Sequence, residues 1–367
     1  MTPAKRVHVE RLNGGEPILR AVEAHPWENG VVFNPGCAFL DDAQAIRRLA
    51  EALPAPGAVK GEVHRKDAVC VLFYRAQGEE TAAADFRRSR LGVAVFDPEL
   101  RLVWRSDDPC LVPESPYENL GIEDPRVTRL GDEFVMCYVG YSSFPPSTPP
   151  PGSTTKVSVC LAVSDDLVTW RKLGPARGTL NDVDNKNAAL FPDRPDRSLV
   201  MFHRPMQGPD AMTIHLAHAT GLGGDWEDVG MIMAPLDDPT FAKSWIGAGA
   251  PPIRIGDDRY LFIYHIGHHR HDGSREYDLG AALLTHREEW KVTSRIEPLL
   301  VLETTAERLG HAALGVNNVV FLCGAYRYGA HLYLPYAGAD SVVLAARLRW
   351  SDLLDALTVL ESEEKAS

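Results

Sequence analysis

The chain of 367 residues is long enough for two average domains or for one large β architecture. Its 50 acidic and 38 basic residues give a formal net charge of −12, which argues against nucleic acid or an anionic membrane as the main partner. The sequence contains no apolar run of about 18 residues, so we expect no transmembrane helix. Its start lacks the apolar stretch of a secretory signal. We therefore expect a cytoplasmic protein.

The chain has six cysteines, and no two of them form a CxxC pair. Five of the six fall in apolar, strand-like runs, which predicts buried free thiols in a reducing compartment. Their spacing does not favour a zinc site. The cysteines are Cys37, Cys70, Cys110, Cys137, Cys160 and Cys323.

A short apolar run that ends in Tyr or His recurs five times, at intervals of about 64, 65, 61 and 72 residues. The last residues of these runs are Tyr74, Tyr138, His203, Tyr264 and Tyr336. A second apolar series follows them, in residues 91–95, 158–162, 214–218, 279–283 and 342–346. A third series precedes them, in residues 34–39, 123–127, 186–191, 249–253 and 317–321.

Five copies of a three- or four-stranded unit with a period near 60 residues are typical of a β-propeller. We predict an all-β fold, a five-bladed β-propeller with short helical insertions, as a single domain over residues 1–367. The blade repeats would span roughly residues 30–350. A two-domain all-β protein is the alternative, but it does not explain why three series share one phase.

Three stretches interrupt the repeat. Residues 41–53 are typical of a capped helix. Residues 351–361 predict a C-terminal helix with Ser351 as a possible N-cap. Residues 142–155 are rich in proline, and we interpret them as a surface loop or as a lid over the substrate site.

The stretch Gly-Ile-Glu-Asp-Pro-Arg at residues 121–126 places two carboxylates and a guanidinium just before an apolar strand. Pro125 fixes its own φ and favours an extended backbone at Asp124. A stiff strand start suits a proton donor, so Asp124 is a candidate catalytic acid. A structural ion pair of Arg126 with Glu123 or Asp124 is the alternative.

The first strand of a propeller blade usually lines the central channel, so the polar starts of these strands would meet at one end of it. They comprise Asn34, Glu123, Asp124, Arg126, Lys186, Asn187, Asn317 and Asn318. Only one of these strands carries acids, whereas hydrolysis of a glycoside needs two. The cations Arg75, Lys186 and Arg204 suit a phosphate, which brings its own nucleophilic oxygen. A salt bridge to a nearby acid is the alternative for each cation.

Seven motifs in order, within the region from Asn34 to Asp340, resemble those of glycoside hydrolase family 130. This family contains inverting β-mannoside phosphorylases and related β-mannosidases. The motifs are EDPR at 123–126, KNAALFP at 186–192, HRP at 203–205, GAGAPPI at 247–253, YH at 264–265, YDLGAALL at 277–284 and NVVF at 318–321.

The resemblance implies a five-bladed propeller that cleaves β-mannosides with inversion, by phosphorolysis to α-mannose 1-phosphate. It implies that Asp124 is the catalytic acid and that its proton passes through a sugar hydroxyl. The positions implied for sugar binding are Asn34, Arg75, Glu123, Asp340, Asn318 and Phe321. Those implied around phosphate are Lys186, Asn187, Arg204 and Tyr277. The expected partners are a small oligosaccharide and inorganic phosphate as co-substrate, with no cofactor and no metal. A homo-oligomer is left open.

Two positions depart from the family pattern. Lys186 stands where phosphorylases commonly have Arg, and Trp245 stands where a further Lys is usual, with Lys243 nearby. A weaker anion site leaves a β-mannoside hydrolase as the alternative, with Asp340 as its base. A family 43-like arabinanase or xylosidase is a more distant alternative. It needs acids on several first strands, where this chain has Asn34 and Lys186. A non-catalytic sugar-binding propeller is the alternative from another class of protein.

Four histidines, His265, His268, His269 and His271, lie within seven residues. Such a cluster could hold a metal. Because the run follows a strand end, we interpret it instead as a polar loop near the substrate channel.

Overall fold

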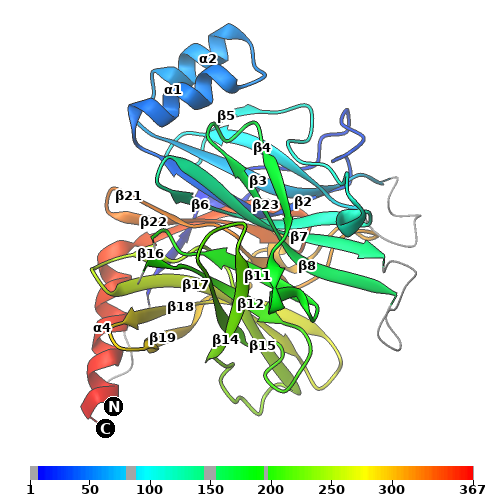
Figure 1. The fold of residues 1–367 in the computed structure, drawn as a ribbon. Coiled ribbons are helices and arrows are strands. Elements are labelled where there is room, and N and C mark those ends of the chain that lie inside the picture. The colour runs from blue at the N-terminus through cyan, green and yellow to red at the C-terminus, as the bar shows by residue number, and fades with distance from the viewer. Residues whose placement is uncertain (1–6, 80–87, 144–153, 194–196, 367) are drawn as a thin grey trace.

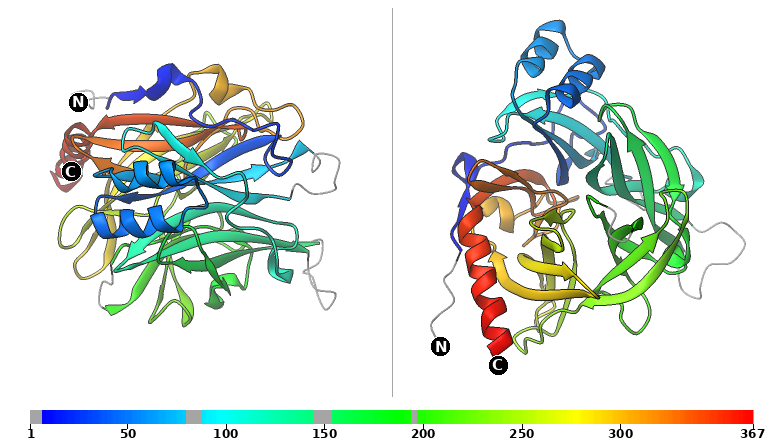
Figure 2. Two further views of the ribbon diagram at one scale, coloured as in Figure 1. Left: turned by 90° about the horizontal axis from the view of Figure 1, so that it is seen from above. Right: turned by 60° about the vertical axis from the view of Figure 1, so that its left-hand side comes forward.

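The structure is a computed structural model that describes residues 7–79, 88–143, 154–193 and 197–366. Five sheets are arranged around a central axis (Figure 2), and each holds four or five strands. This is the five-bladed β-propeller that the repeat predicts.

Each blade runs from an inner strand at the channel to an outer strand at the surface. Blade 1 contains β2 Val31–Leu40, β3 Val69–Gln77, β4 Arg90–Phe96 and β5 Leu102–Arg105. Blade 2 contains β6 Gly121–Leu130, β7 Glu133–Ser143, β8 Thr155–Ser164 and β9 Arg171–Pro175. Blade 3 contains β11 Asn185–Leu190, β12 Leu199–Pro205, β13 Ile214–Ala219, β14 Asp225–Met233 and the short β10 Arg177–Gly178. Blade 4 contains β15 Lys243–Ala248, β16 Ile253–Arg254, β17 Arg259–His269, β18 Arg275–His286 and β19 Trp290–Leu300.

Blade 5 is completed by the N-terminal part of the chain. Its strands are β20 Val320–Phe321, β21 Tyr326–Tyr328, β22 His331–Gly338, β23 Val342–Arg349 and β1 Val9–Arg11. Strand β1 pairs antiparallel with β23, so residues from the two ends of the sequence share one sheet and close the ring. The sequence repeat begins near residue 30 and does not predict this strand.

The three longer helices lie outside the ring of blades (Figure 1). Helix α1, Ala43–Ala52, confirms the predicted helix, and the Asp42 side chain caps it by accepting from the N–H groups of Gln44 and Ala45. Helix α2, Gly57–His64, was not predicted. A short helix α3 spans Thr305–Arg308.

The C-terminal helix α4, Trp350–Ala366, confirms the second predicted helix. The prediction of Ser351 as its N-cap is wrong, because β23 runs directly into the helix and Ser351 lies in its first turn. Most of the predicted proline-rich loop, residues 144–153, lies outside the described residues. None of the helices described combines the length and the apolar character needed to cross a membrane.

Apolar side chains from facing sheets fill the space between neighbouring blades. All six cysteines are free, five of them are buried, and Cys110 is half-buried, as the sequence predicts. The inner strands of blades 1 and 2 approach closely at Gly36, where an added Cβ would lie 1.9 Å from the carbonyl oxygen of Pro125. The channel is therefore tight next to the predicted acid.

Candidate active site

Four blades carry a left-handed residue on the inner strand or just before it. Asn34, Asp124, Asn187 and Asn318 have φ values of 47°, 53°, 57° and 60°. In blades 1 to 3 the register shifts at this point, which is a β-bulge that re-aims a side chain. Asn and Asp tolerate this conformation better than other side chains. A non-glycine residue held there costs about 1–3 kcal/mol and is typical of functional sites.

The expected extended backbone at Asp124 is therefore wrong. The bulge between Glu123 and Arg126 requires a left-handed residue, and this requirement outweighs the preference that Pro125 imposes. The consequence for the side chain is favourable, because the bulge presents it to the channel at a fixed position.

The Asp124 carboxylate is buried and held from one side. Its Oδ1 accepts a 2.8 Å hydrogen bond from Nδ2 of Asn34 and lies 3.6 Å from Nη1 of Arg75. Its Oδ2 accepts no hydrogen bond from the described residues. One oxygen is thus oriented by the protein, and the other is available for a substrate hydroxyl.

Glu123 has different surroundings. Its Oε1 accepts a 2.6 Å hydrogen bond from Nη2 of Arg75, and its Oε2 accepts a 2.9 Å bond from Nζ of Lys186. Burial opposes ionisation of this carboxyl, but the two cations outweigh burial and lower its pKa to about 2. Glu123 is therefore a carboxylate at neutral pH and cannot donate a proton, which leaves Asp124 as the candidate acid of this strand.

Arg126 pairs with neither acid, so the alternative of a structural ion pair with Glu123 or Asp124 is wrong. Its guanidinium donates to the carbonyl oxygens of Gly249 at 2.7 Å, Ala248 at 3.0 Å and Asp124 at 3.1 Å. The side chain joins blade 2 to blade 4 across the channel and fixes the backbone at Asp124.

Arg204 is the second-last residue of β12 and is 7% exposed. Within the described ranges no carboxylate lies at ion-pair distance from it, and its Nη1 lies 3.4 Å from Nε2 of His265. Burial lowers the pKa of Arg204 to about 10. Burial, together with Arg204 and Arg126, also lowers the pKa of His265 well below its usual range. A neutral imidazole therefore faces a guanidinium whose charge no described acid neutralises.

Two further polar atoms beside Arg204 have no partner in the described structure, namely its own Nε and Oδ1 of Asn187. An added Cβ at Gly247 would lie 2.6 Å from both Asn187 Oδ1 and His265 Nε2. Only glycine leaves room here for the carboxamide and the imidazole. Buried polar atoms without partners indicate a ligand position.

The remaining predicted residues come from blades 4 and 5. The N–H of Tyr277 donates to the carbonyl oxygen of Asn318 at 3.0 Å, and the rings of Tyr277 and Phe321 lie 6.3 Å apart. Burial raises the pKa of Asp340 to about 6, against the opposing effect of Arg75. Asn317 does not belong to the channel, because it is exposed and its Oδ1 accepts the N–H of Gly310.

Trp245 brings an indole, and not a cation, to this region. It is 4% exposed, and its ring lies over Gly267 and edge-on to Tyr277 at 5.4 Å. Lys243 is exposed at the start of β15, opposite His269. Lys186 is paired with Glu123, and Trp245 stands in place of a lysine. We infer that Arg204 is the principal cation without a carboxylate partner in the described part of the channel.

The four clustered histidines have separate neighbours, and the ring of His269 lies 5.0 Å from that of Trp245. The first three lie within β17 and not in the predicted loop. His265 faces Arg204, His268 Nδ1 lies 2.8 Å from Oγ of Ser244, and His271 Nε2 lies 3.2 Å from the carbonyl oxygen of Pro239. They do not converge on one point, and the absence of a metal site stays a prediction.

Comparisons with known proteins identify the family of this chain. The family model for glycoside hydrolase family 130, described as beta-1,4-mannooligosaccharide phosphorylase, matches residues 56–359. A 1,2-beta-oligomannan phosphorylase from Thermoanaerobacter sp. (strain X514) is 33% identical over 95% of this chain and 99% of its own length. A beta-1,2-mannobiose phosphorylase from the same organism is 30% identical over 89% of this chain and 92% of its own length.

Among solved structures, the beta-1,2-mannobiose phosphorylase of Listeria innocua superposes with a TM-score of 0.71. The match covers 96% of this chain and 99% of that chain at 20% identity, and it supports the fold. The family model and the two relatives together show that this chain belongs to glycoside hydrolase family 130.

Proposed function

We propose that the protein is an inverting β-mannoside phosphorylase that releases α-mannose 1-phosphate. The observation that carries the proposal is the buried Arg204, which no described carboxylate neutralises and which lies next to unpartnered polar atoms of Asn187 and of its own side chain. Such a site suits an oxyanion. The names of two relatives support β-1,2-linked mannosides as the first substrates to test.

In the proposed reaction, phosphate held by Arg204 and Asn187 attacks the anomeric carbon of the mannosyl residue. The bond from that carbon to the glycosidic oxygen breaks as a new bond to a phosphate oxygen forms. Asp124 supplies the proton that the leaving oxygen gains, through a sugar hydroxyl. Attack opposite to the leaving group inverts the anomeric configuration, and no carboxylate base is needed.

Lys186 has a different proposed role from Arg204. Its ammonium is bound to Glu123 at 2.9 Å, so it already has a counter-ion in the absence of phosphate. We assign it to the border between sugar and phosphate, where it can hold Glu123 in place and contribute positive charge. The proposed sugar contacts are those implied by the family, namely Asn34, Arg75, Glu123, Asp340, Asn318 and Phe321.

Cleavage of β-1,2-mannobiose with and without inorganic phosphate tests the proposal. We expect mannose 1-phosphate and mannose in equal amounts, with a rate that depends on phosphate. Arg204→Met should raise the KM for phosphate by about 10- to 100-fold, because a charge-assisted hydrogen bond contributes about 1.5–3 kcal/mol. Free mannose released at a rate that phosphate does not change would contradict phosphorolysis.

A β-mannoside hydrolase remains the second candidate, because Asp340 is a half-buried carboxyl with a pKa of about 6. Such a group could activate water. In that case Asp340→Asn would abolish mannose release, and Arg204→Met would leave it nearly unchanged.

A further inference from the structure

Four of the five blades contain the same buried clamp, in which a tyrosine on the second strand donates to a glutamate that also binds a cation. In blade 1, Tyr74 donates to Glu28 at 2.9 Å, and Arg105 donates to the same carboxylate at 2.5 Å. In blade 2, Tyr138 donates to Glu118 at 3.2 Å, and Lys172 is the cation.

The clamps of blades 4 and 5 follow the same plan. Tyr264 donates to Glu297 at 2.6 Å, and Arg295 lies 3.5 Å from that carboxylate. Tyr336 donates to Glu307 at 2.7 Å, and Arg11 donates to it at 2.8 Å. The clamp explains why the repeat in the sequence ends in tyrosine. Burial raises the pKa of each of these tyrosines, so their hydroxyls stay protonated at neutral pH.

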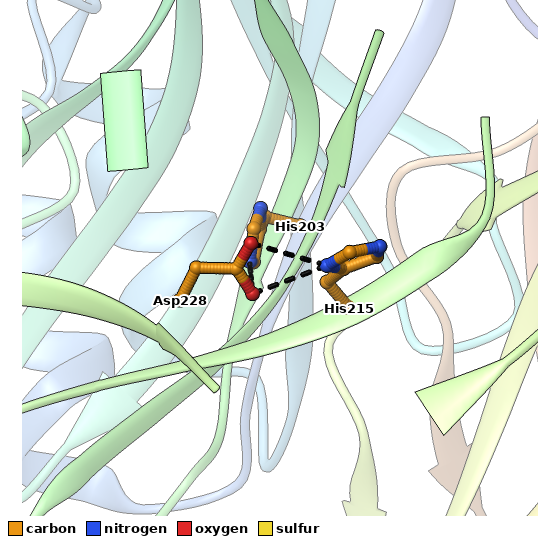
Figure 3. A group of neighbouring side chains, drawn as sticks. All are labelled: His203, His215 and Asp228. Atoms are coloured by element: carbon orange, nitrogen blue, oxygen red, sulfur yellow. Dashed lines mark hydrogen bonds and ion pairs between the residues drawn. The ribbon is translucent and has the colours of Figure 1, made fainter. Parts of the chain in front are cut away.

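Blade 3 replaces this clamp with two histidines and an aspartate (Figure 3). His203 on β12 has the tyrosine position, and its Nε2 lies 3.3 Å from Oδ1 of Asp228 on β14. Nδ1 of His215 on β13 lies 3.1 Å from Oδ1 and 3.2 Å from Oδ2 of the same carboxylate. The three side chains come from three neighbouring strands and meet at one point.

These residues are close enough to hold a metal ion, but a hydrogen bond to His203 argues against it. Nδ2 of Asn185 donates to the carbonyl oxygen of Leu180 at 2.7 Å, and Oδ1 of Asn185 accepts the N–H of Arg204 at 3.1 Å. The amide nitrogen must therefore be the atom that faces Nδ1 of His203 at 2.9 Å. His203 accepts at Nδ1 and carries its proton on Nε2, toward Asp228, where a metal would need a lone pair.

The same contacts connect the clamp to the anion site. Asn185 is fully buried and precedes Lys186 and Asn187 on β11, and its side chain holds the backbone N–H of Arg204 on β12. Side chains alternate along a strand, so His203 and Arg204 project from opposite faces of β12. A chain of contacts thus runs from Asp228 on β14 through His203 and Asn185 to the backbone of Arg204, which is proposed to bind phosphate.

His215 is the member of this chain that favours a charge. Its Nδ1 faces Asp228, and its Nε2 lies 3.2 Å from the carbonyl oxygen of Asp210, so both ring nitrogens face acceptors. Burial opposes protonation, but Asp228 and Asp210 outweigh it and raise the pKa of His215. Burial lowers the pKa of His203, against Asp228. Asp210, Asp228 and His203 are the titratable groups that face His215.

We propose that His203, His215 and Asp228 are positioning residues for the anion site, and that the proton on His215 strengthens phosphate binding. This inference rests on the proposed phosphorolysis. Loss of the proton would remove a positive charge from blade 3 and one of two donors to the carbonyl oxygen of Asp210, which also accepts from Oγ1 of Thr213 at 2.6 Å. Both changes weaken the strands that present Lys186, Asn187 and Arg204. The other four clamps have no histidine at the positions of His203 and His215, although Nδ1 of His25, which precedes the inner strand, lies 2.7 Å from the Glu28 carboxylate of blade 1.

The test uses His215→Gln, with Tyr74→Phe as the matched control from the clamp of blade 1. The KM for phosphate and kcat are measured for β-1,2-mannobiose between about pH 5.5 and 8.5. We expect His215→Gln to raise the KM for phosphate about tenfold at pH 6, with kcat at saturating phosphate nearly unchanged. The ratio of variant to wild-type KM should fall toward one as pH rises, because wild-type His215 then loses its proton.

Phosphate itself titrates in this pH range, and its effect cancels when the KM of the variant is divided by the KM of the wild type at the same pH. Tyr74→Phe should lower the melting temperature and leave the KM for phosphate unchanged at every pH. Should His215→Gln fail to fold, Asp228→Asn carries the same expectation, since the Asp228 side chain is 35% exposed and tolerates substitution better. Phosphate protection against thermal unfolding gives a second readout without turnover.

A ratio near one at all pH values, or an equal rise in KM for Tyr74→Phe, would overturn the inference. Wild-type turnover that does not depend on phosphate would instead refute the proposed function. The two failures are therefore distinguishable.

Discussion

Adjacent carboxylates with different partners have different roles at the residue scale. Glu123 binds Arg75 and Lys186 and stays ionised, whereas Asp124 receives one amide hydrogen bond from Asn34 and keeps Oδ2 free of protein donors among the described residues. We predict that Asp124→Asn lowers kcat by about 10²- to 10⁴-fold, the usual contribution of general acid catalysis. The rate of mannose 1-phosphate release measures this loss.

Binding of β-1,2-mannobiose to Asp124→Asn, measured by calorimetry, is the control for this prediction. Affinity should stay within a few-fold of wild type, because the amide has the shape of the carboxylate. A variant that keeps its turnover would remove Asp124 from the role of acid, and a wild type that binds without turnover would support the sugar-binding alternative.

The pH dependence of stability gives a second prediction for a single residue. Burial raises the folded-state pKa of Asp340 to about 6, above the value of about 3.9 for an unfolded Asp. Folding therefore disfavours the carboxylate, and this cost is absent below about pH 4, grows as pH rises to 6 and stays constant above. Asp340→Asn should thus be more stable than wild type at pH 8, by at most about 3 kcal/mol.

Thermal unfolding at pH 4.5, 6 and 8 checks this prediction. The gain in melting temperature of Asp340→Asn over wild type should shrink as pH falls. A difference that is the same at all three pH values, or a variant that is less stable at pH 8, would show that the ionised carboxylate is not disfavoured in the folded protein.

At the scale of the element, the recurring strands could be predicted because each blade repeats the same series of apolar runs. The tyrosines and His203 mark the second strands. Their number gives the number of blades, and their spacing gives the length of one repeat. Their partners could not be predicted, because Glu28 and Glu307 precede the inner strand of their blade, whereas Glu297 lies on the outer strand. The weak signal for the blade 3 clamp was the histidine that stands in a series of tyrosines.

The inner-strand bulges show a second limit of the sequence. The Asn and Asp residues at these points could be identified as candidates from their polarity. Their left-handed backbone could not, because it follows from the register shift between two strands and not from local preference. Pro125 even favours the opposite conformation at Asp124.

A glycine between two blades provides a test at this scale. An added Cβ at Gly36 would lie 1.9 Å from the carbonyl oxygen of Pro125, so one of the two inner strands must move. We predict that Gly36→Ala destabilises the protein by about 1–3 kcal/mol or more. It should also lower kcat by about 100-fold, because a shift near 1 Å would misplace Asp124.

Urea unfolding and steady-state kinetics measure these effects, with Gly57→Ala in α2 as the matched control. No atom lies within 4 Å of an added Cβ at Gly57, so this variant should unfold within about 1 kcal/mol of wild type and keep its activity. Equal behaviour of the two variants would mean that the bulge adapts without cost.

At the scale of the whole molecule, the site exists only because the ring closes. Its proposed residues come from all five blades, and the predicted convergence of inner strands brought most of them together. The exposed Asn317 shows where this reasoning fails, because one residue of offset moves a side chain out of the channel. The closing strand β1 was also missed, since three residues carry no periodic signal.

The closure itself depends on one buried contact. Arg11 on β1 donates to Glu307, whose side chain is fully buried, whereas its neighbour Glu10 forms an exposed pair with Arg347. Arg11→Met removes the cation and leaves a buried carboxylate, which should destabilise the protein by about 3–5 kcal/mol. Glu10→Gln on the same strand should cost at most about 1 kcal/mol.

Urea unfolding of both variants measures the difference in stability. Because the site needs the closed ring, the activity of Arg11→Met should be lost at a lower urea concentration. Equal destabilisation by the two changes would mean that Tyr336 and the backbone N–H groups suffice to hold Glu307, and that β1 closes the ring through its strand pairing alone.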